Sequence, residues 1–412
     1  MLIAYIGAPE ALAGLRKGAI MDDAIIASPE PAQARARPLR IALVTGSYNY
    51  IQDGVALTLN RMVGFLTSRG VEVLVFAPVG KTPAFVHQGE IVPVPSIAAP
   101  GRGEYRAALG LPRRPRERLV AFRPDILHIA TPVLLGHAAQ RLGRRMGWPV
   151  VASYHTRFET YLRYYGLAAL TPTLSGMVRA FYDACREIYV PSPSMIDVLR
   201  ADGVTAPIRL WPRGVDTARF HPGARSQTWR AERGIGRDDV VIAFVSRLVR
   251  EKRVAEVAGV FARLRAQGIA HRALFVGDGP ERGFLEREVP NALFEGFLSG
   301  ADLATAYASS DLFLFPSDTE TFGNVTLEAM ASGLPTVCAD ATGSRSLVDP
   351  GVTGYLADAG DVAALSDALA RLVADRDLRQ AMGEAARARS LTFSWDEAMG
   401  ALLARYEALA QA

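Results

Sequence analysis

One stretch in the second half of the chain constrains the fold more than any other. It opens with a short apolar run at residues 312–315, which has the composition of a strand buried in a parallel sheet. A polar loop follows, and then residues 325–331 show a helical pattern that Gly333 and Pro335 end. A second apolar run at residues 336–339 begins the next strand. This order predicts a doubly wound α/β sheet with the loop at the carboxyl end of a strand, where open α/β sheets bind ligands.

Two carboxylates, Glu320 and Glu328, stand on either side of this loop-to-helix junction. Eight residues of helix rise about 12 Å, so the two carboxylates cannot share one proton or one metal ion. The unpaired backbone N–H groups around Phe322, Gly323 and Asn324 can hold an anion or a hydroxyl. The pattern fits an elongated ligand with hydroxyls at both ends and phosphates between, such as a nucleotide sugar. The alternative is that both glutamates are solvated charges that the helix dipole favours.

The context of the two glutamates is more specific than their spacing. They are embedded in the sequences FGNV, from Phe322, and EAMASGLP, from Glu328. The stretch resembles the E-x7-E signature of retaining nucleotide-sugar glycosyltransferases of family 4, and further matches cover the chain from about Leu39 onward. The resemblance implies the GT-B fold: α/β, with two Rossmann-like doubly wound parallel-sheet domains facing a central cleft. It also implies that Glu320 binds sugar hydroxyls and that Glu328 binds the ribose.

The implied activity is transfer, with retention, of a hexosyl group (mannose, glucose or glucuronic acid) from a nucleoside diphosphate (NDP) sugar. A lipid or lipid-linked glycan hydroxyl is the first choice of acceptor, as in bacterial glycolipid- and mannoside-forming members. A soluble sugar or small-molecule acceptor and a non-catalytic nucleotide-sugar binding module are the alternatives. A dehydrogenase is disfavoured because the dinucleotide fingerprint G-x-G-x-x-G is missing.

The length of 412 residues, half of them apolar, accommodates two domains of ordinary size. We expect a disordered extension at 1–38, an N-terminal acceptor domain at 39–212 and a C-terminal nucleotide-sugar domain at 213–393. The resemblance implies that a last helix, at 394–412, returns to the first domain. Alternating β and α segments predict parallel sheets, with strands at 40–45, 71–77, 125–130, 150–153 and 188–190, and at 240–246, 273–277, 293–295, 312–315 and 336–339.

Two cations follow the first strand of the second domain. Arg247 and Lys252 stand where a strand ends and a helix begins, which suits a clamp on a diphosphate and stabilises the leaving group as negative charge develops. The spacing resembles the family's R-x4-K motif. The family usually has glycine after the lysine, and here Arg253 takes that place. The alternative is a pair of ordinary solvated basic residues.

Three further positions complete the predicted nucleotide site. Gly277, in the sequence VGDGP, resembles the family's G-x-G-P loop, which lets backbone approach the nucleotide. Phe297 lies in a segment that resembles the one reading the base through backbone groups. Gly54 follows the first strand and would let backbone approach the β-phosphate. Asp53 replaces the first of two glycines that relatives often have there, and it also suits a helix cap.

His155 ends another predicted strand, and it matches a family histidine that faces the donor sugar near the reaction centre. The alternative is a structural histidine. The run from Tyr161 to Tyr165 supplies aromatic surface for an acceptor. The sequence offers no nucleophile–base pair, so retention is better explained by front-face attack, in which the leaving diphosphate accepts the proton of the acceptor hydroxyl.

No cofactor or metal is expected. The sequence lacks zinc and P-loop motifs, and the D-x-D at Asp375–Asp377 is interpreted as solvated charge. The two cysteines, Cys185 and Cys338, fit buried free thiols in a reducing compartment. No nucleic-acid-binding module is present, so no nucleic-acid partner is expected.

An arginine-rich segment at 101–123 has leucine, valine and phenylalanine interleaved, and no apolar run approaches the ~20 residues of a membrane-spanning helix. Such a segment can lie on anionic lipid, so we expect a cytoplasmic protein in peripheral contact with the inner face of the membrane. The alternative is a solvated loop and helix face. The arginines concerned are Arg102, Arg106, Arg113, Arg114, Arg116, Arg118 and Arg123.

Overall fold

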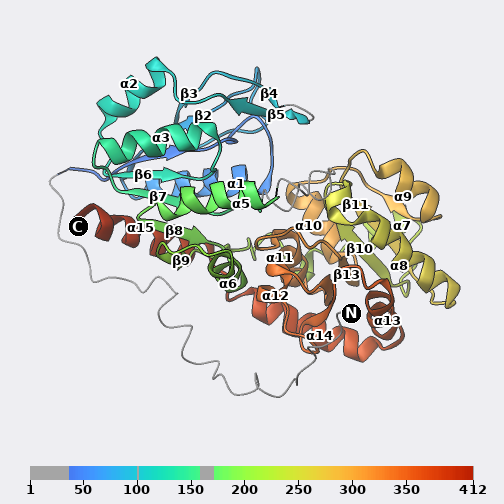
Figure 1. The fold of residues 1–412 in the computed structure, drawn as a ribbon. Helices are drawn as coiled ribbons and strands as arrows, with labels where there is room; N and C mark the ends of the chain where they lie inside the picture. The colour runs from blue at the N-terminus through green and yellow to red at the C-terminus, as the bar shows by residue number, and fades with distance from the viewer. Residues whose placement is uncertain (1–36, 100–101, 158–170, 412) are drawn as a thin grey trace, which may run out of the picture.

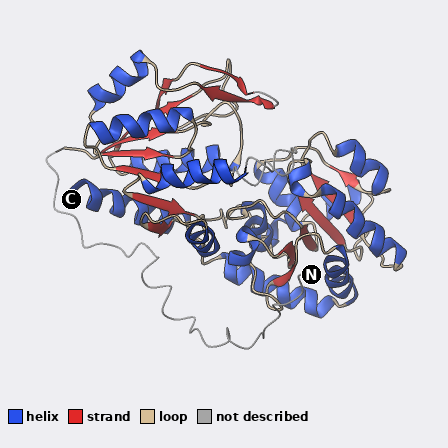
Figure 2. Cartoon of the chain, in the orientation of Figure 1, coloured by secondary structure: helices blue, strands red, loops and turns tan. Residues whose placement is uncertain are grey.

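The computed structural model describes residues 37–99, 102–157 and 171–411. The predicted extension therefore lies almost entirely outside the described residues, and so do Tyr161 and Tyr165. Two sheets, one in each half of the molecule, carry helices on both of their faces (Figure 1, Figure 2). The predicted fold class, two Rossmann-like domains with parallel sheets, is confirmed.

The first sheet has seven parallel strands in the order β3-β2-β1-β6-β7-β8-β9. Alternate residues of a strand face opposite sides, so Ile41 and Leu43 pack under one helical layer and Ala42 and Val44 under the other. The strands are β1 (Arg40–Val44), β2 (Glu72–Ala77), β3 (Glu90–Pro93), β6 (Ile126–Ile129), β7 (Val150–Ser153), β8 (Glu187–Val190) and β9 (Ile208–Leu210). The helices are α1 (Gly54–Ser68), α2 (Arg113–Phe122), α3 (Leu134–Arg145), α5 (Thr171–Asp183) and α6 (Pro193–Ala201).

The second sheet has six parallel strands in the order β12-β11-β10-β13-β14-β15, which is the Rossmann order. The strands are β10 (Val241–Val245), β11 (Arg272–Val276), β12 (Leu293–Phe294), β13 (Leu312–Phe315), β14 (Thr336–Ala339) and β15 (Gly354–Ala357). The α-helices are α7 (Gln227–Glu232), α8 (Val254–Ala266), α9 (Arg282–Glu288), α10 (Gly300–Ala308), α11 (Asn324–Ala331), α12 (Thr342–Leu347), α13 (Val362–Ala374) and α14 (Arg376–Ser390), and η2 (Pro222–Ala224) and η3 (Arg250–Lys252) are 3-10 turns.

The last helix, α15 (Trp395–Gln411), packs on the first sheet beside α1 (Figure 1). Arg405 forms an ion pair with the buried Glu187 at the start of β8. The chain therefore crosses between the domains twice, and the crossings touch: the N–H of Val215 donates to the carbonyl of Phe393 at 3.1 Å. Gly214 is required there, because a Cβ on it would lie 2.2 Å from the backbone nitrogen of Trp395.

Every strand predicted from the sequence is present, with ends that shift by at most one residue. Several elements were missed. They are β3, β9 and β15, at the edges of the sheets, and an antiparallel hairpin of β4 (Ser96–Ala99) and β5 (Arg102–Ala108). The hairpin and α2 together account for the arginine-rich segment.

Candidate active site

The loops after β10 and β13 are the centre of the candidate site. These two strands are neighbours in the second sheet, and the chain continues from them toward opposite edges. Lys252, from the loop after β10, forms an ion pair with Glu320, from the loop after β13. Their side chains are 11% and 21% exposed, so the pair is largely shielded from water. The structure thus joins two predicted site residues that are far apart in the sequence.

Arg247 lies at the domain boundary. Its side chain is 44% exposed, and its guanidinium is 3.7 Å from the buried carboxylate of Glu251. Burial raises the pKa of Asp53 in the first domain, and the positive charge of Arg247 opposes that shift. Arg247 therefore faces an acidic group of the opposite domain while remaining accessible to a ligand.

Arg253 occupies the position where the family usually has glycine. Its backbone is left-handed, with φ of 56°, a conformation that glycine adopts without strain. Its guanidinium pairs with Glu256 and, at 2.6 Å, with Asp318. The turn that places Lys252 is therefore preserved, with two ion pairs holding a non-glycine residue in it.

Two helix N-termini from different domains face each other. Helix α11 begins at Asn324 after the left-handed Gly323, whose φ is 92°. Helix α1 begins at Gly54, and a Cβ on that glycine would lie 3.4 Å from the side-chain nitrogen of Asn324. Asp53 caps α1 by accepting a hydrogen bond from the N–H of Ala56 at 2.8 Å, as predicted. Both helix dipoles present their positive ends to the same gap, which favours an anion.

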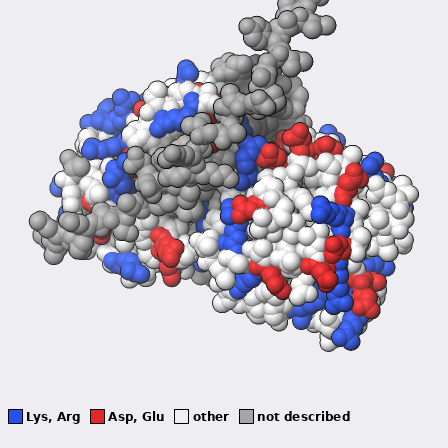
Figure 3. Space-filling view, turned by 90° about the horizontal axis from the view of Figure 1, so that it is seen from below, with Lys and Arg blue, Asp and Glu red and all other residues white. Residues whose placement is uncertain are grey.

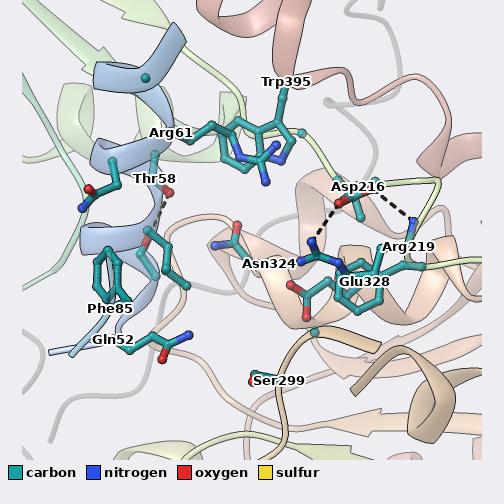
Figure 4. Close-up of a pocket in the computed structure, with 18 of the residues that line it drawn as sticks. Gln52, Thr58, Arg61, Phe85, Asp216, Arg219, Ser299, Asn324, Glu328 and Trp395 are labelled. Atoms are coloured by element: carbon teal, nitrogen blue, oxygen red, sulfur yellow. Dashed lines mark hydrogen bonds and ion pairs between the residues drawn. The ribbon is translucent and has the colours of Figure 1, made fainter. Parts of the chain in front are cut away.

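Glu328 lies on the wall of a cavity of about 830 Å³ between the domains (Figure 4). Burial raises the pKa of its carboxyl to about 7, although the hydroxyl of Tyr307 donates a hydrogen bond to it at 3.3 Å. Asp216 and Arg219, from the segment between the domains, lie beside it, and Thr58 of α1 faces it from the opposite wall. The cavity is therefore built by both domains, as the predicted central cleft requires.

The remaining residues that were predicted to bind the nucleotide lie in different environments. Phe297 is 65% exposed and lines the same cavity as Glu328. Phe322 is buried beneath the start of α11. Gly277, with φ of 127°, is required by the packing of the protein itself, because a Cβ there would lie 1.9 Å from the carbonyl oxygen of Ser246. It allows the loops after β10 and β11 to touch.

His155 is held by one residue of the first domain and by one residue of the segment between the domains. Its Nε2 is 2.8 Å from the hydroxyl of Ser153, and the guanidinium of Arg213 donates to its Nδ1 at 2.9 Å. Burial and the charge of Arg213 lower the pKa of His155 well below its usual value. Both ring nitrogens are thus engaged, and the contact with the loop of Glu320 runs through the backbone: Thr321 donates its hydroxyl proton to the carbonyl of His155 at 2.8 Å.

Sequence reasoning missed three residues around this point, namely Arg213, Ser192 and Thr321. Arg213 stands shortly after β9, and Ser192 stands just after β8. Their positions next to strand ends were the available signal, because the carboxyl ends of parallel strands converge on one edge. The two cysteines are buried and free, as predicted.

Within the described ranges, no three His, Cys, Asp or Glu side chains gather in a way that could hold a metal ion. No helix in the same ranges is both long enough and apolar enough to cross a membrane.

The fold and the cleft define the class of protein: a GT-B protein, with two Rossmann-like domains around one cavity. Sucrose-phosphate synthase from Thermosynechococcus elongatus has this fold, with a TM-score of 0.71 over 89% of this chain and 98% of that chain at 21% identity. This likeness shows the fold alone.

Sequence comparison shows the family. Residues 52–219 match the family described as Glycosyltransferase Family 4, and residues 225–389 match Glycosyl transferases group 1. A GDP-mannose-dependent alpha-mannosyltransferase of Corynebacterium glutamicum is 34% identical over 90% of this chain and 89% of its own length. Alpha-monoglucosyldiacylglycerol synthase of Streptococcus pneumoniae is 26% identical over 73% of this chain and 70% of its own length. The chain belongs to the family 4 glycosyltransferases, as its motifs predicted, and it is a hexosyltransferase.

Proposed function

We propose that this enzyme transfers a mannosyl group from GDP-mannose to a hydroxyl of a lipid or lipid-linked acceptor, with retention of configuration. The ion pair of Lys252 and Glu320 on one side of the α11 N-terminus, with Glu328 on the other, is the observation that carries the proposal. In this proposal Glu320 binds the sugar, Lys252 and the α11 N-terminus bind the diphosphate, and Glu328 binds the ribose. The name of the 34% identical relative favours GDP-mannose, and glucose and glucuronic acid remain the alternatives for the sugar.

In this assignment the diphosphate lies between the N-termini of α1 and α11, within reach of Arg247 and Lys252. When the bond from the anomeric carbon to the diphosphate breaks, negative charge develops on the leaving oxygen, and these cations and helix dipoles stabilise it. Binding of the sugar hydroxyls by Glu320 draws its carboxylate away from Lys252, which frees the ammonium for the phosphate. We propose that no divalent metal is needed, because two side-chain cations already supply the charge; unchanged turnover in excess chelator tests this.

Retention follows from attack on the front face of the sugar. The acceptor hydroxyl approaches the anomeric carbon from the side of the leaving diphosphate. A new bond to the acceptor oxygen forms as the bond to the diphosphate breaks, and the acceptor proton passes to the diphosphate. The clustering of cations on that side supports this geometry. The anomeric configuration of the product, read by NMR from its one-bond C–H coupling, is α for retention and β for inversion of an α-linked donor.

The acceptor assignment rests on the first domain. Residues 39–212 contain 20 basic and 11 acidic residues, whereas residues 213–393 contain 21 and 24. The second domain, at the right of Figure 3, shows both signs of charge intermixed on the visible face. On α2, Arg114 and Arg116 are exposed, and neither forms an ion pair with any described residue. Such a surface fits the anionic inner face of a membrane, where we place the enzyme as a peripheral protein.

Apolar side chains of the first domain support an amphiphilic acceptor. Leu57 is 44% and Val86 is 91% exposed, and both line the cavity with the half-buried Phe65 and Phe85. Exposed apolar clusters commonly mark binding surfaces. The relative named as a diacylglycerol-modifying synthase fits the same interpretation.

The test is donor turnover by the purified full chain. GDP-mannose, UDP-glucose and UDP-glucuronate are each offered with a bacterial lipid extract, with a panel of soluble sugars, or alone. Transfer of mannose that requires lipid is the expected result. Transfer only to a soluble sugar would replace the acceptor assignment, and tight donor binding without any turnover would identify a binding module. Glu320→Ala and Lys252→Ala are the control variants, and neither should transfer the sugar.

A further inference from the structure

Thr321 connects the loop of Glu320 to the first domain through hydrogen bonds. Its hydroxyl donates to the carbonyl of His155 at 2.8 Å, and its own carbonyl accepts a hydrogen bond from the hydroxyl of Ser192 at 2.9 Å. His155 and Ser192 follow β7 and β8, which are neighbouring strands of the first sheet. One residue of the second domain is therefore held at two points by the first domain.

The His155 anchor is rigid. Arg213 is 4% exposed, donates to the carbonyl of Trp211 at 3.0 Å and stacks over its indole, with 4.3 Å from the guanidinium carbon to the ring centroid. A guanidinium can only donate, so Nδ1 of His155 must accept, and the proton of the neutral ring lies on Nε2, facing the Ser153 hydroxyl. With both nitrogens fixed, the imidazole holds the backbone of His155 in place.

A second line of contacts reaches the other side of the same peptide. The hydroxyl of Thr342 donates to the carbonyl of Glu320 at 2.6 Å. The carbonyl of Thr342 in turn accepts a hydrogen bond from Ser194, on α6 of the first domain. Next to Thr342, a Cβ on Gly343 would lie 2.8 Å from the Cβ of Glu320, so this side of the loop is closely packed. The backbone on both sides of the Glu320–Thr321 peptide is thus tied to the first domain.

Thr319, the other neighbour of Glu320, provides an internal contrast. Its hydroxyl donates to the carbonyl of Glu251 at 3.4 Å and lies 3.3 Å from the hydroxyl of Ser317. Both partners belong to the second domain. The two threonines that flank Glu320 are therefore chemically alike, but only Thr321 bridges the domains.

We propose that Thr321 is a positioning residue that makes the placement of Glu320 depend on contact between the two domains. This rests on the proposed function, in which Glu320 holds the donor sugar. Glu328 and the α11 N-terminus do not require these hydrogen bonds to bind the nucleoside diphosphate. Loss of the Thr321 contacts should therefore impair sugar transfer and leave nucleotide binding intact.

The test compares Thr321→Val with Thr319→Val, two near-isosteric changes on either side of Glu320. Misplacing a reacting group by about 1 Å costs about 100-fold in rate, so we expect Thr321→Val to lower kcat by about 10- to 100-fold. The dissociation constant of the NDP should change less than about twofold. The kcat loss in Thr319→Val should be at least several-fold smaller than the loss in Thr321→Val. Thr321→Ser keeps a hydroxyl at this position and should therefore retain most of the wild-type rate. Equal kcat losses in the two valine variants would overturn the proposal.

A second measurement does not depend on turnover. Amide hydrogen exchange of a peptide covering residues 316–324 should accelerate in Thr321→Val and in Ser192→Ala, and should remain near the wild-type rate in Thr319→Val. If the wild type transfers no sugar under any condition but this exchange pattern holds, the domain link stands and the proposed function fails. If transfer occurs and the exchange pattern is absent, only the positioning role fails.

Discussion

The two domains share a strand order but divide the chemistry unequally. In each sheet the chain starts at a central strand, moves outward to one edge and then crosses to the other, so both have a site between diverging strands. In the second domain that site holds Arg247, Lys252 and Glu320. In the first domain it presents the capped start of α1, and the partly buried His155 follows the next strand, β7. The same scaffold therefore supplies ligand-binding side chains in one domain, and in the other mainly backbone and an enclosing wall.

The difference teaches that the catalytic geometry belongs to neither domain alone. Glu320 is paired within the second domain through Lys252, and its neighbour Thr321 is held by the first. In the proposed function the second domain binds the donor nucleotide, whereas the sugar position also depends on the first. The predictions below test how far this division holds, beginning with the largest expected effect.

Removing the central ion pair should have the largest consequence. Lys252→Ala should lower kcat by about 1000-fold, because it removes a cation beside the leaving diphosphate, and losing one transition-state donor costs about 100- to 1000-fold. It also leaves the Glu320 carboxylate largely shielded without its partner, so the melting temperature should fall. Steady-state kinetics and thermal unfolding measure the two effects.

The double variant Lys252→Ala/Glu320→Gln separates them. It should recover most of the lost stability, since no uncompensated charge remains, and it should recover no activity. Turnover within tenfold of wild type in either variant would contradict the assignment of Lys252 to the leaving diphosphate.

Glu328 should make donor binding depend on pH. Its pKa is near 7 in the ligand-free protein, raised mainly by burial. An ionised carboxylate only accepts hydrogen bonds, and in the proposed site the ribose hydroxyls donate to it. The nucleotide-sugar substrate should therefore bind more tightly when Glu328 is ionised. We expect the dissociation constant for the nucleotide to fall by up to about tenfold between pH 6 and pH 8. Glu328→Gln should bind more weakly and with no such dependence; a parallel pH dependence in both proteins would contradict this assignment.

The ionisation of Glu328 should also make the free energy of unfolding depend on pH. The folded state raises the pKa of this carboxyl, so it favours the protonated form, whereas the unfolded chain ionises near 4.5. The contribution of the Glu328 carboxyl to the free energy of unfolding is therefore fully present below about pH 4.5. It is lost as pH rises through about 7, and the loss is at most about 3 kcal/mol. Thermal unfolding should show Glu328→Gln gaining stability relative to wild type between pH 5 and pH 8.

The features predicted from the sequence are those with a local cause. Strands buried on both faces are continuous apolar runs, so β10, β13 and β14 could be predicted. The missed edge strands β3 and β15 consist mostly of partly exposed residues, which gives no such run. Lys252 and Glu320 were identified through motifs. The hydrogen bonds of Thr321 with Ser192 and His155 join segments far apart in the chain, so no local motif marks them. Only the packing of two domains creates them.

The charge difference between the domains should appear in membrane binding. Arg114→Gln/Arg116→Gln on α2 should weaken binding to vesicles of phosphatidylglycerol and phosphatidylcholine by about 30-fold, since each basic residue near such a surface contributes about 1 kcal/mol. Sedimentation with vesicles at low and at physiological salt measures it. Arg237→Gln/Arg376→Gln, which removes two exposed arginines of the second domain, is the matched control and should bind as wild type. Equal losses in the two double variants would mean that net charge, not the α2 surface, drives binding.

The smallest expected effect compares two left-handed arginines, one in each domain. Arg123 ends α2 with φ of 48°, and Arg253 precedes α8 with φ of 56°. A non-glycine residue in this conformation costs about 1 kcal/mol. No described residue forms an ion pair with Arg123, whereas Arg253 pairs with Glu256 and Asp318.

Arg123→Gly should therefore stabilise the protein by about 0.5–1 kcal/mol, whereas Arg253→Gly should change stability by less than about 0.5 kcal/mol, because the two partly exposed ion pairs it loses offset the relieved strain. Urea unfolding of both variants measures the difference. High salt should narrow it, since screening weakens the ion pairs of Arg253 and leaves the backbone strain unchanged. A gain as large for Arg253→Gly as for Arg123→Gly would show that those pairs contribute nothing, and that the turn below Lys252 is held by its backbone alone.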